Sequence, residues 1–547
     1  MSNLGVTIER GVPCILRDGT RLDADIYRPH IDEPLPVLLM RQPYGRALAS
    51  TVTYAHPIWY ARHGYLVVIQ DVRGRGTSEG TFNPFVQEVH DGYDAVEWAA
   101  ALPGSNGRVG MYGFSYQGAT QWAALAGHPP HLVAIAPAMC AADLYHGWFY
   151  RDGRLALTEL GWAMQLARDT AQRQQDLRRV EALTEAMLNP PYGRVPLADQ
   201  PELSGLDVPF WAEWVAHDRY DAYWAERNWL PHVLAQPIPT LQVGGWFDPY
   251  LAGTLQSYTA LQAEDPGRHT LIIGPWGHIP WGQKSAAYTA GPPGDRRPDE
   301  ITIKFFDYWL KNQKSDGWGA PVQYYCLGQN TWVDTDHWPP RHIPRRWYLH
   351  SQGQANGASG DGILAEHPAL SEPPDLYVYD ARLPMRLDSY APVDRSLLQE
   401  RREILVYTAP PLERDLSLVG SATLRLFAQV LDGPTDLIAV LSAKAPDGSA
   451  RFLSLARETL STPFDEPMSP LMLTFRPIAV RLSAGMALRL ELTSSAFPLL
   501  ARHPNGDQPV SATTLLTLKM ATVSVWHDRD HDTSLWLPTV DCPEEVT

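Results

Sequence analysis

The sequence predicts an α/β domain that is interrupted by a helical insertion and followed by an all-β sandwich. Three observations lead to this prediction. Apolar runs of strand length alternate with helical stretches over residues 1–142 and 236–345, residues 143–235 are polar and helical, and short strands separated by Gly, Pro and Asp occupy 346–547. We therefore expect a split α/β domain, a helical cap and a C-terminal β-sandwich with these boundaries.

The first quarter of the chain has the pattern of a parallel sheet. Cys14–Tyr27 predicts a hairpin around an Asp-Gly turn, with period-2 alternation after the turn. Pro36–Met40, Tyr65–Ile69 and Leu132–Ala136 are continuous apolar runs, as expected of strands that are buried on both faces. An amphipathic helix is expected over Asp91–Ala100. Strand–helix–strand units of this kind place their strands in parallel and cover the sheet with helices.

Strand signals stop at about residue 143. A long polar helical stretch covers 159–188 and ends at Asn189-Pro-Pro191, and a second helical stretch, rich in Trp, covers 211–227. Buried-strand patterns resume at Pro239–Val243 and Thr270–Gly274. Because these two strands continue the earlier sheet pattern, the helices of residues 143–235 that precede them are expected to form an insertion in one α/β domain.

The remainder of the chain changes from helical to strand patterns. A last helix is expected over Ile301–Leu310, and Trp338–Arg345 has the composition of a linker. Ala445–Gly448 is a strong hairpin turn. Short strands are expected at 376–379, 403–407, 422–428, 437–441, 488–492 and 523–526. Many short strands without intervening helices predict a β-sandwich of about two hundred residues.

The length and composition are typical of an acidic, folded protein with more than one domain. At 547 residues it suggests two or three domains, and a net charge of −16 argues against nucleic acid or an anionic membrane as a partner. Met1–Arg10 lacks the apolar core of a signal peptide, and the longest apolar stretch, Leu132–Ala142, is too short to span a bilayer. The cysteines are widely scattered without a C-x-x-C pair, so we expect reduced thiols in a cytoplasmic protein. They are Cys14, Cys140, Cys326 and Cys542.

A serine stands at a predicted strand-to-helix junction in the segment Gly113-Phe-Ser115-Tyr-Gln-Gly118. Residues 107–112 before it are apolar enough for a buried strand, and Ala119–Ala126 after it favours a helix. Glycines beside such a serine permit the sharp turn of a nucleophile elbow, which exposes the hydroxyl above the sheet. The helix that follows points its first amides at an anion forming there. This context predicts a serine hydrolase with Ser115 as its nucleophile.

Ser78 is a second candidate, because Gly76-Thr-Ser78-Glu-Gly80 fits the pattern G-x-S-x-G. A loop separates Ser78 from the strand Leu66–Gln70, and Asn83 and Pro84 prevent a helix from starting directly after it. We therefore interpret Ser78 as part of a glycine-rich surface loop.

A nucleophilic serine needs a base and an acid that orients the base. In α/β-hydrolases the chain order is serine, acid, histidine, with each residue just past a strand. Asp248 follows the strand at 239–243 and His278 follows the strand at 270–274. Asp143 and Asp307 are alternative acids, but neither follows an equally clear buried strand. A lone histidine beside glycines is usually a loop residue, so it is the ordered set of three that predicts the triad.

An oxyanion hole needs two hydrogen-bond donors. The backbone amide of Tyr116, which follows the serine, is the first expected donor. The loop Met40–Arg46 lacks a His-Gly-Gly pattern that would supply the second donor from the backbone. Tyr44 in this loop can donate its phenol instead, because an ordinary tyrosine stays protonated near neutral pH. The alternative is that Tyr44 only packs against its neighbours.

Five segments carry a family resemblance: Pro43-Tyr44, Asp71–Gly80, Gly113–Gly118, Gly245–Asp248 and Gly274–His278. Together they resemble the cocaine-esterase-like acyl hydrolases, a group similar to the X-Pro dipeptidyl-peptidases and the α-amino acid ester hydrolases. The resemblance extends over nearly the whole chain.

This resemblance implies roles for the same residues. It implies Ser115 as nucleophile, Asp248 and His278 as its partners, and Tyr44 and Tyr116 as oxyanion donors. It also implies a helical cap, a jelly-roll C-terminal domain and no metal or organic cofactor, which agrees with the lack of a clustered Cys/His pattern in the sequence.

Departures from the relatives narrow the expected substrate. The α-amino acid ester hydrolases carry acids shortly after the triad aspartate, where they hold a substrate ammonium, whereas Pro249-Tyr250-Leu251 follows Asp248 here. Aromatic residues around the site predict an apolar acyl pocket, the alternative being that they pack the cap against the core. They are Trp148, Phe149, Trp246, Phe247, Tyr250 and Trp281. Cap acids are the other candidates for contacting an ammonium: Asp143, Asp152, Glu159 and Asp218.

The sequence thus predicts a serine carboxylesterase that cleaves esters, or amides, of small and mainly neutral apolar acyl groups through an acyl-enzyme. One alternative is an X-Pro dipeptidyl-peptidase or an α-amino acid ester hydrolase or acylase. A more remote one is a non-catalytic binding protein in which the sandwich holds a ligand. The expected partner is a small-molecule substrate, and a homo-oligomer is compatible with the sequence but not defined by it.

Overall fold

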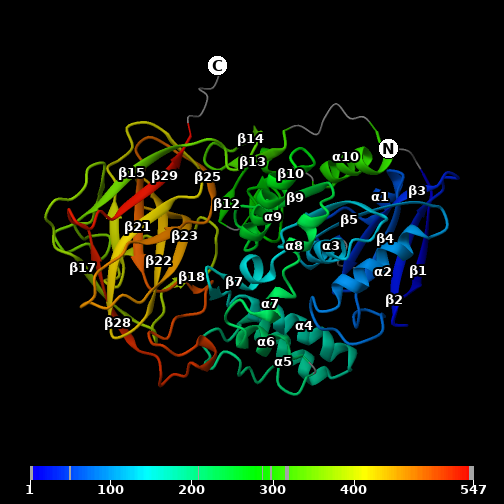
Figure 1. The fold of residues 1–547 in the computed structure, drawn as a ribbon, viewed down its shortest axis with the longest axis horizontal. Coiled ribbons are helices and arrows are strands. Elements are labelled where there is room, and N and C mark those ends of the chain that lie inside the picture. Colours follow the sequence, from blue (N-terminus) through cyan, green and yellow to red (C-terminus); the bar gives the residue numbers. More distant parts are fainter. Residues whose placement is uncertain are drawn as a thin grey trace.

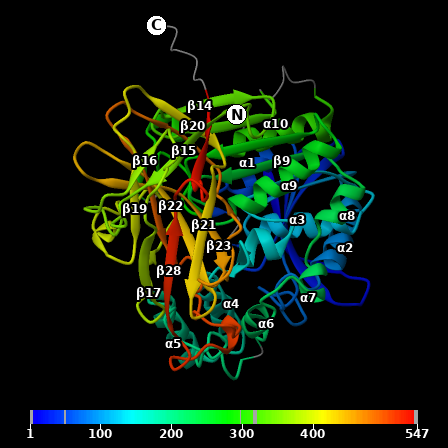
Figure 2. The same cartoon turned by 60° about the vertical axis from the view of Figure 1, so that its left-hand side comes forward.

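The computed structural model describes residues 4–47, 51–206, 208–285, 287–295, 298–313 and 320–540, so Cys542 lies outside the described residues. Three units lie together in Figure 1: an α/β unit on the right, a β-sandwich on the left and a helical cap below them. The cap helices α4–α6 stay at the lower end when the molecule is turned (Figure 2). The predicted fold class is confirmed.

The α/β unit is built on a ten-stranded sheet with the order β1-β2-β4-β3-β5-β6-β9-β10-β13-β14. Neighbouring strands from β4 to β13 are parallel, and antiparallel pairs close both edges. The strands are β1 Val6–Ile15, β2 Arg21–Pro29, β3 Leu35–Gln42, β4 Leu66–Asp71, β5 Ser105–Phe114, β6 Leu132–Ala138, β9 Thr240–Gly245, β10 His269–Gly274, β13 Val322–Cys326 and β14 Thr331–Thr335. As expected, the central strands are buried on both faces.

Helices cover both faces of this sheet. α1 and α10 pack with one set of apolar strand residues, and α2 and α3 pack with the other set. The helices are α1 Pro57–Arg62, α2 Glu88–Ala100, α3 Tyr116–Ala126, α9 Leu251–Glu264 and α10 Pro298–Lys311. No helix within the described ranges is long and apolar enough to cross a membrane.

The cap differs from the prediction in three places, one being that the stretch expected over 211–227 is helical only over Phe210–Ala216 and Ala222–Ala225. The helical stretch expected over 159–188 is broken into α4 and α5, because Gln175 takes a positive φ of 61° and Asp176 caps the second helix. The insertion also contains a small hairpin, β7–β8, which the sequence analysis did not predict. The cap elements are a π-helical turn Tyr145–Phe149, β7 Tyr150–Arg151, β8 Arg154–Leu155, α4 Glu159–Arg173, α5 Leu177–Leu188, α6 Phe210–Ala216, α7 Ala222–Ala225 and α8 Leu230–Ala235.

The sandwich strands form one thirteen-stranded hydrogen-bonded network. Its first strand, β15, begins at Ile343, so the last part of the predicted linker Trp338–Arg345 is strand. The predicted turn Ala445–Gly448 joins β22 to β23, and Gly448 there has a φ of 90°. The strands are β15 Ile343–His350, β16 Ile363–Ala365, β17 Asp375–Asp380, β19 Leu405–Thr408, β20 Leu416–Gly420, β21 Thr423–Leu431, β22 Thr435–Lys444, β23 Ala450–Leu460, β24 Leu471–Thr474, β25 Ile478–Leu482, β26 Ala487–Thr493, β28 Met520–Trp526 and β29 Ser534–Thr539.

Three two-residue pairs complete the strands. They are β7–β8 in the cap, β11 Lys284–Ser285 with β12 Tyr288–Thr289, and β18 Arg386–Leu387 with β27 Phe497–Pro498.

A buried ionic cluster joins the cap to the sandwich. Arg154 in β8 donates from Nε and Nη2 to the two carboxylate oxygens of Asp436 in β22, at 3.1 and 2.8 Å. Arg457 in β23 donates to the same carboxylate, with an Nε–Oδ1 distance of 3.1 Å. Burial alone would raise the pKa of Asp436, but the two guanidinium groups hold it well below its usual value. The hairpin is therefore attached to the sandwich by one carboxylate between two arginines.

We expect Asp436→Asn to lower the free energy of unfolding by about 3–5 kcal/mol at pH 7, since it leaves two buried guanidinium groups without a charged partner. The folded-state pKa is depressed, so this stabilisation is present above about pH 4 and is lost as the pH falls further. Urea denaturation at pH 7 and at pH 3 would measure both effects. The exposed Asp465→Asn on the same domain is the control, and an equal loss in both variants would contradict the assignment.

Candidate active site

Ser115 occupies the sharp turn between β5 and α3. Its φ of 58° and ψ of −128° are strained for a residue with a side chain, and its amide is held by the carbonyl of Ala138 at 2.9 Å. A Cβ at Gly118 would lie 2.5 Å from the sulfur of Cys140, and one at Gly113, whose φ is 138°, would lie 2.5 Å from Cβ of Gln117. The two motif glycines are therefore required by close packing around the turn.

Ser78 has a different environment from Ser115. It is fully buried, and not in a surface loop as expected. Its hydroxyl donates to the carbonyl of Asp71 at 2.8 Å and accepts from the amide of Asp23 at 2.9 Å. Both hydrogen-bonding directions are used within the protein, so Ser78 fastens the loop after β4 and has no access to a substrate.

Asp248 and His278 meet just beyond the ends of β9 and β10, which are parallel neighbours in the sheet. Asp248 Oδ1 lies 2.7 Å from Nδ1 of His278, and Oδ2 accepts the amide of Tyr250 at 3.1 Å. The carboxylate is fully buried, whereas 26% of the His278 side chain is exposed. A proton on Nδ1 that is shared with Asp248 leaves Nε2 as the acceptor of the ring.

Ring packing places His278 beside the serine turn. The ring of Phe114, the residue directly before Ser115, lies 5.5 Å from the imidazole, and the ring of Tyr250 meets it edge-on at 5.1 Å. The alternative acids have other partners: Asp143 bonds the imidazole of His146 at 2.8 Å, and Asp307 accepts the hydroxyl of Tyr65 at 2.8 Å. Asp248 is thus the acid that the fold pairs with His278.

Tyr44 and Tyr116 present donors on the same side of the sheet. The phenol of Tyr44 accepts the indole N–H of Trp162 at 3.0 Å, which leaves its own proton available for donation. Burial raises the pKa of Tyr44, so the phenol is protonated over the ordinary pH range. Tyr116 is the first residue of α3, and its amide has no carbonyl of that helix to bond. Its side chain points elsewhere, because its hydroxyl donates to Glu88 at 2.9 Å.

The predicted pocket aromatics divide into two groups. Trp148 is fully buried and stacks on Tyr250 at 4.2 Å, and Phe149 packs behind it against Trp214. Trp246 and Phe247 instead pack toward the sandwich side, where their rings lie 5.8 Å from Trp338 and 5.7 Å from Tyr288.

Trp281 lies behind the histidine. Its indole donates to the carbonyl of His278 at 3.0 Å and its ring packs on Phe114. The ring contacts of Trp246 and Phe247 do not test whether these side chains reach a substrate, so their position in the pocket stays a prediction.

The cap and the segment between β4 and α2 supply further residues near the site that were not singled out from the sequence. Trp162 in α4 stacks on Trp214 with ring planes 4° apart, and Phe85 stacks on Tyr116 at 4.5 Å. Arg75 donates to the carbonyl of Leu166 in α4 at 3.0 Å and so holds the helix that carries Trp162. The abundance of Trp in the cap was the only feature of the sequence that indicated these contacts, because the residues in contact come from distant segments.

Glu159 is the cap acid that reaches this group. Its carboxylate accepts the Tyr250 hydroxyl at 3.1 Å and lies 3.6 Å from Nη2 of Arg151. Burial raises the pKa of Glu159 to about 7, while Arg151, Tyr250 and the nearby His278 act in the opposite direction. Of the other acids named above, Asp143 pairs with His146, and Asp152 and Asp218 accept hydrogen bonds from Arg457 and Tyr145 through their backbone carbonyls.

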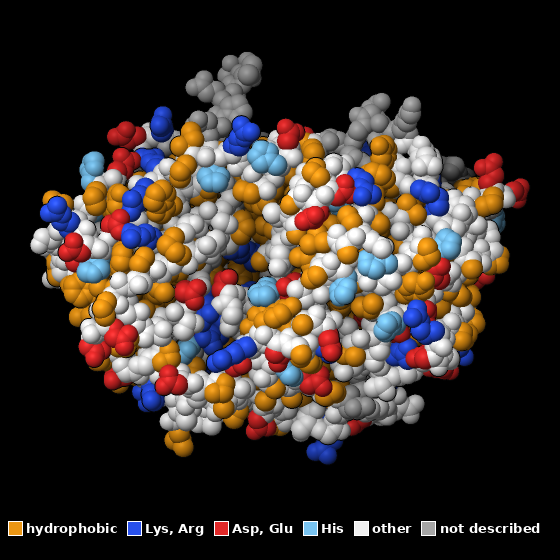
Figure 3. Space-filling model, in the orientation of Figure 1, with side chains coloured by type: hydrophobic (Ala, Val, Ile, Leu, Met, Phe, Trp, Pro, Cys, Tyr) orange, Lys and Arg blue, Asp and Glu red, His pale blue; other side chains and the backbone are white. Residues whose placement is uncertain are grey.

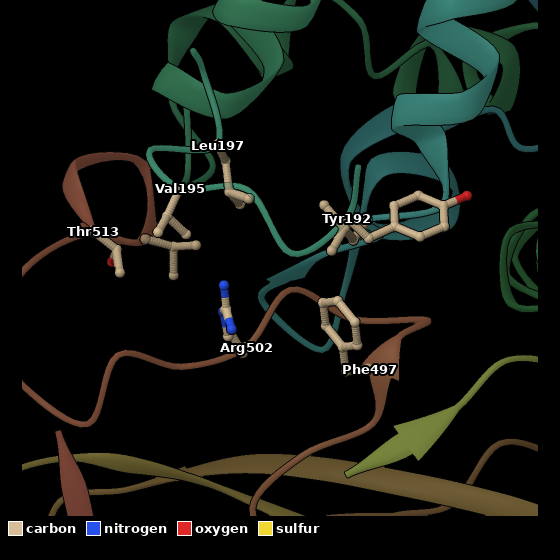
Figure 4. Close-up of a pocket in the computed structure, with 8 residues that line it drawn as sticks. Tyr192, Val195, Leu197, Phe497, Arg502 and Thr513 are labelled. Carbon is tan, nitrogen blue, oxygen red and sulfur yellow. The ribbon is translucent and has the colours of Figure 1, made fainter. Parts of the chain in front are cut away.

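The surface near these residues is hollowed. Figure 3 shows a depression near the middle of the face, with Lys or Arg side chains inside it, where Figure 1 has β7, β12 and β18. A separate cavity between the cap and the sandwich measures only about 10 Å³, room for about one water, and is therefore too small for a substrate (Figure 4). Its lining is Leu157, Tyr192, Val195, Leu197, Phe497, Arg502, Val510 and Thr513.

The fold and this arrangement define an α/β-hydrolase with a serine elbow and an adjacent acid–histidine pair. Residues 18–280 match the X-Pro dipeptidyl-peptidase (S15) family, and residues 317–535 match the C-terminal non-catalytic domain of X-Pro dipeptidyl-peptidases. Cocaine esterase from Rhodococcus sp. is 30% identical, in an alignment that covers 96% of this chain and 97% of that protein. The chain therefore belongs to the cocaine-esterase-like acyl hydrolases of the S15 family.

Solved structures share the whole fold. An aminopeptidase from a Thaumarchaeota archaeon superimposes with a TM-score of 0.80 at 21% identity, covering 98% of this chain and 97% of that one. An α-amino acid ester hydrolase superimposes with a TM-score of 0.78 at 22% identity and the same coverage. At these identities the likeness establishes the fold alone.

Proposed function

We propose that this protein is a serine carboxylesterase in which Ser115, His278 and Asp248 form the catalytic triad. The observation that carries the proposal is the buried Asp248–His278 bond of 2.7 Å beside the strained serine turn. Family membership supports a hydrolase that uses serine, and the esterase activity named for the similar cocaine esterase supports an ester as substrate.

The proposed reaction begins with proton transfer from the hydroxyl of Ser115 to Nε2 of His278 as the serine oxygen attacks the ester carbonyl carbon. Asp248 keeps the imidazole in the correct tautomer and stabilises the imidazolium that forms. The imidazolium then gives its proton to the departing alkoxide, which leaves an acyl group on Ser115. A water attacks this acyl-enzyme with His278 again as base, and the carboxylic acid is released.

The oxyanion of each tetrahedral intermediate would lie between the Tyr44 phenol and the Tyr116 amide. Trp162 supports this role, because its N–H occupies the phenol as an acceptor and turns the phenolic proton away from the cap helix. Donors held in place before the reaction stabilise the developing charge without having to reorient. The rings of Trp162 and Tyr250 would form the apolar surface on which the acyl group lies, with the fully buried Trp148 packed against both.

We expect Ser115→Ala to abolish hydrolysis of a chromogenic butyrate ester and labelling by a fluorophosphonate probe. Ser78→Ala, the matched control, should keep both activities, although the loss of two buried hydrogen bonds should lower the free energy of unfolding by about 1–3 kcal/mol. Full labelling of the Ser115→Ala protein would contradict the assignment of Ser115 as the nucleophile of the triad. A folded wild-type protein that turns over no simple ester would favour the non-catalytic alternative.

Tyr44→Phe removes one oxyanion donor and keeps the ring. We expect kcat to fall about a hundred- to a thousandfold, or about 3–4 kcal/mol, with little change in KM or Tm. Tyr112→Phe is the control, because its hydroxyl is buried and has no hydrogen-bond partner among the described residues. An unchanged kcat in Tyr44→Phe would place the second donor elsewhere.

Glu159 is the buried acid that would support the second candidate, a hydrolase for substrates with a free amino group, if its carboxylate were free to bind an ammonium. Its charge is already matched by Arg151 and its oxygens accept from Tyr250, so an incoming ammonium would compete with both. A desolvated ammonium without a free carboxylate costs several kcal/mol. The site therefore favours neutral acyl groups.

We expect benzoate or butyrate esters to exceed phenylglycine methyl ester and X-Pro anilides in kcat/KM by about tenfold or more, equivalent to about 1.4 kcal/mol. The comparison should be made on the wild type and on Glu159→Gln. A preference for the amino ester that disappears in Glu159→Gln would overturn the expectation and assign ammonium binding to Glu159.

A further inference from the structure

A single arginine of the sandwich reaches the turn that carries Asp248. Arg476 lies between β24 and β25, more than two hundred residues after the α/β strands that hold the site. Its Nη2 donates to the backbone carbonyl of Trp246 at 3.2 Å and also to the backbone carbonyl of Asp248. These carbonyls belong to the loop directly after β9, so the sandwich contacts the acid of the proposed triad through its main chain.

Arg476 is held in this position from both ends. Its amide donates to the carbonyl of Leu455 at 2.9 Å, and its carbonyl accepts the hydroxyl of Ser454 at 2.6 Å, so β23 fixes its backbone. The guanidinium lies 4.0 Å from the ring centre of Tyr390. Tyr390 in turn accepts Nη1 of Arg151 from the cap at 3.1 Å. The Arg476 side chain therefore has little conformational freedom where it contacts the turn.

The amides of this turn are bonded within the α/β unit, for example Asp248 to the carbonyl of Gly245 at 3.1 Å, so Arg476 acts on the carbonyl side of the turn. The Asp248 carbonyl also accepts the amide of Leu251, but that distance is 3.3 Å. The Asp248 carboxylate must remain 2.7 Å from His278 while its second oxygen accepts the Tyr250 amide. A shift of about 1 Å in a supporting group can lower a rate by about a hundredfold.

We propose that Arg476 is a positioning residue of the active site, which makes the sandwich domain part of the catalytic machinery. This proposal rests on the proposed triad. By bonding two carbonyls of the Asp248 turn, Arg476 fixes the direction from which the carboxylate meets His278. The matching domain is described as non-catalytic in X-Pro dipeptidyl-peptidases, and this contact gives it a role in the reaction here.

A purely structural role makes different predictions from a positioning role. The cluster of Arg154, Asp436 and Arg457 already joins the sandwich to the cap, and its ion pairs among the described residues do not involve the Asp248 turn. If Arg476 only joined domains, its loss would lower stability and leave the turnover of the folded enzyme unchanged. If it positions Asp248, its loss lowers turnover in protein that remains folded.

The test compares Arg476→Met, Arg476→Lys and the control Arg481→Met in the full chain. Arg481 lies in the same domain and pairs with Asp415 away from the site. We expect Arg476→Met to lower kcat for a butyrate ester and the rate of fluorophosphonate labelling by about 10- to 100-fold, with KM within about threefold. Arg476→Lys should recover part of kcat through one donor, and Arg481→Met should match the wild type.

The pH profile supplies a second readout. The charged and titratable groups around His278 are Asp248, Glu159 and Tyr250, with Arg476 and Arg151 behind them. A purely structural role would leave the pH dependence of kcat/KM unchanged, whereas displacement of Asp248 relative to His278 should change it in Arg476→Met.

Unchanged kcat in folded Arg476→Met, or an equal loss in Arg481→Met, would overturn the proposal. Should Arg476→Met fail to fold, Arg476→Lys, which keeps the charge, decides: a kcat equal to wild type would overturn the proposal, and a lowered kcat in folded protein would support it. Full probe labelling of Ser115→Ala would instead overturn the triad, whatever the arginine variants do.

Discussion

The proposed site depends on one buried carboxylate, Asp248. A carboxylate that is removed from water is costly unless hydrogen bonds and charges compensate it. Here the imidazole of His278 and the amide of Tyr250 bond the carboxylate, and the sandwich arginine Arg476 bonds the backbone carbonyl of the same residue. The α/β unit, the start of α9 and the C-terminal domain therefore all contact this one residue.

The cap contributes buried aromatic rings to the site and polar contacts to both the α/β unit and the sandwich. Trp162 from α4 bonds Tyr44, and Arg75 holds the same helix to the loop after β4. Arg151 and Arg154, from the two strands of one small hairpin, face Tyr390 and Asp436 of the sandwich. Because the same insertion touches the oxyanion side and the sandwich, a change at the cap–sandwich junction can alter both stability and turnover.

Much of the site could be predicted because it follows local rules. Ser115, Asp248 and His278 each stand just after a strand, and parallel strands deliver their ends to one edge of a sheet. The directions in which the aromatic side chains point could not be predicted from the sequence. Trp246 and Tyr250 are four residues apart, yet only Tyr250 faces the histidine, because the backbone turn between them sends their side chains in different directions.

The sequence by itself determined the class of fold, the hydrolase elbow and the order of serine, acid and histidine, since these depend on short-range patterns of apolar residues, glycines and strand ends. Only the tertiary structure decided that Ser78 is a buried structural serine, that Glu159 is paired with Arg151, and that Arg476 reaches Asp248. These contacts join residues from separate elements and, for Arg476, from separate domains. Local patterns carry no information about such pairs, because their partners are selected by how the units pack.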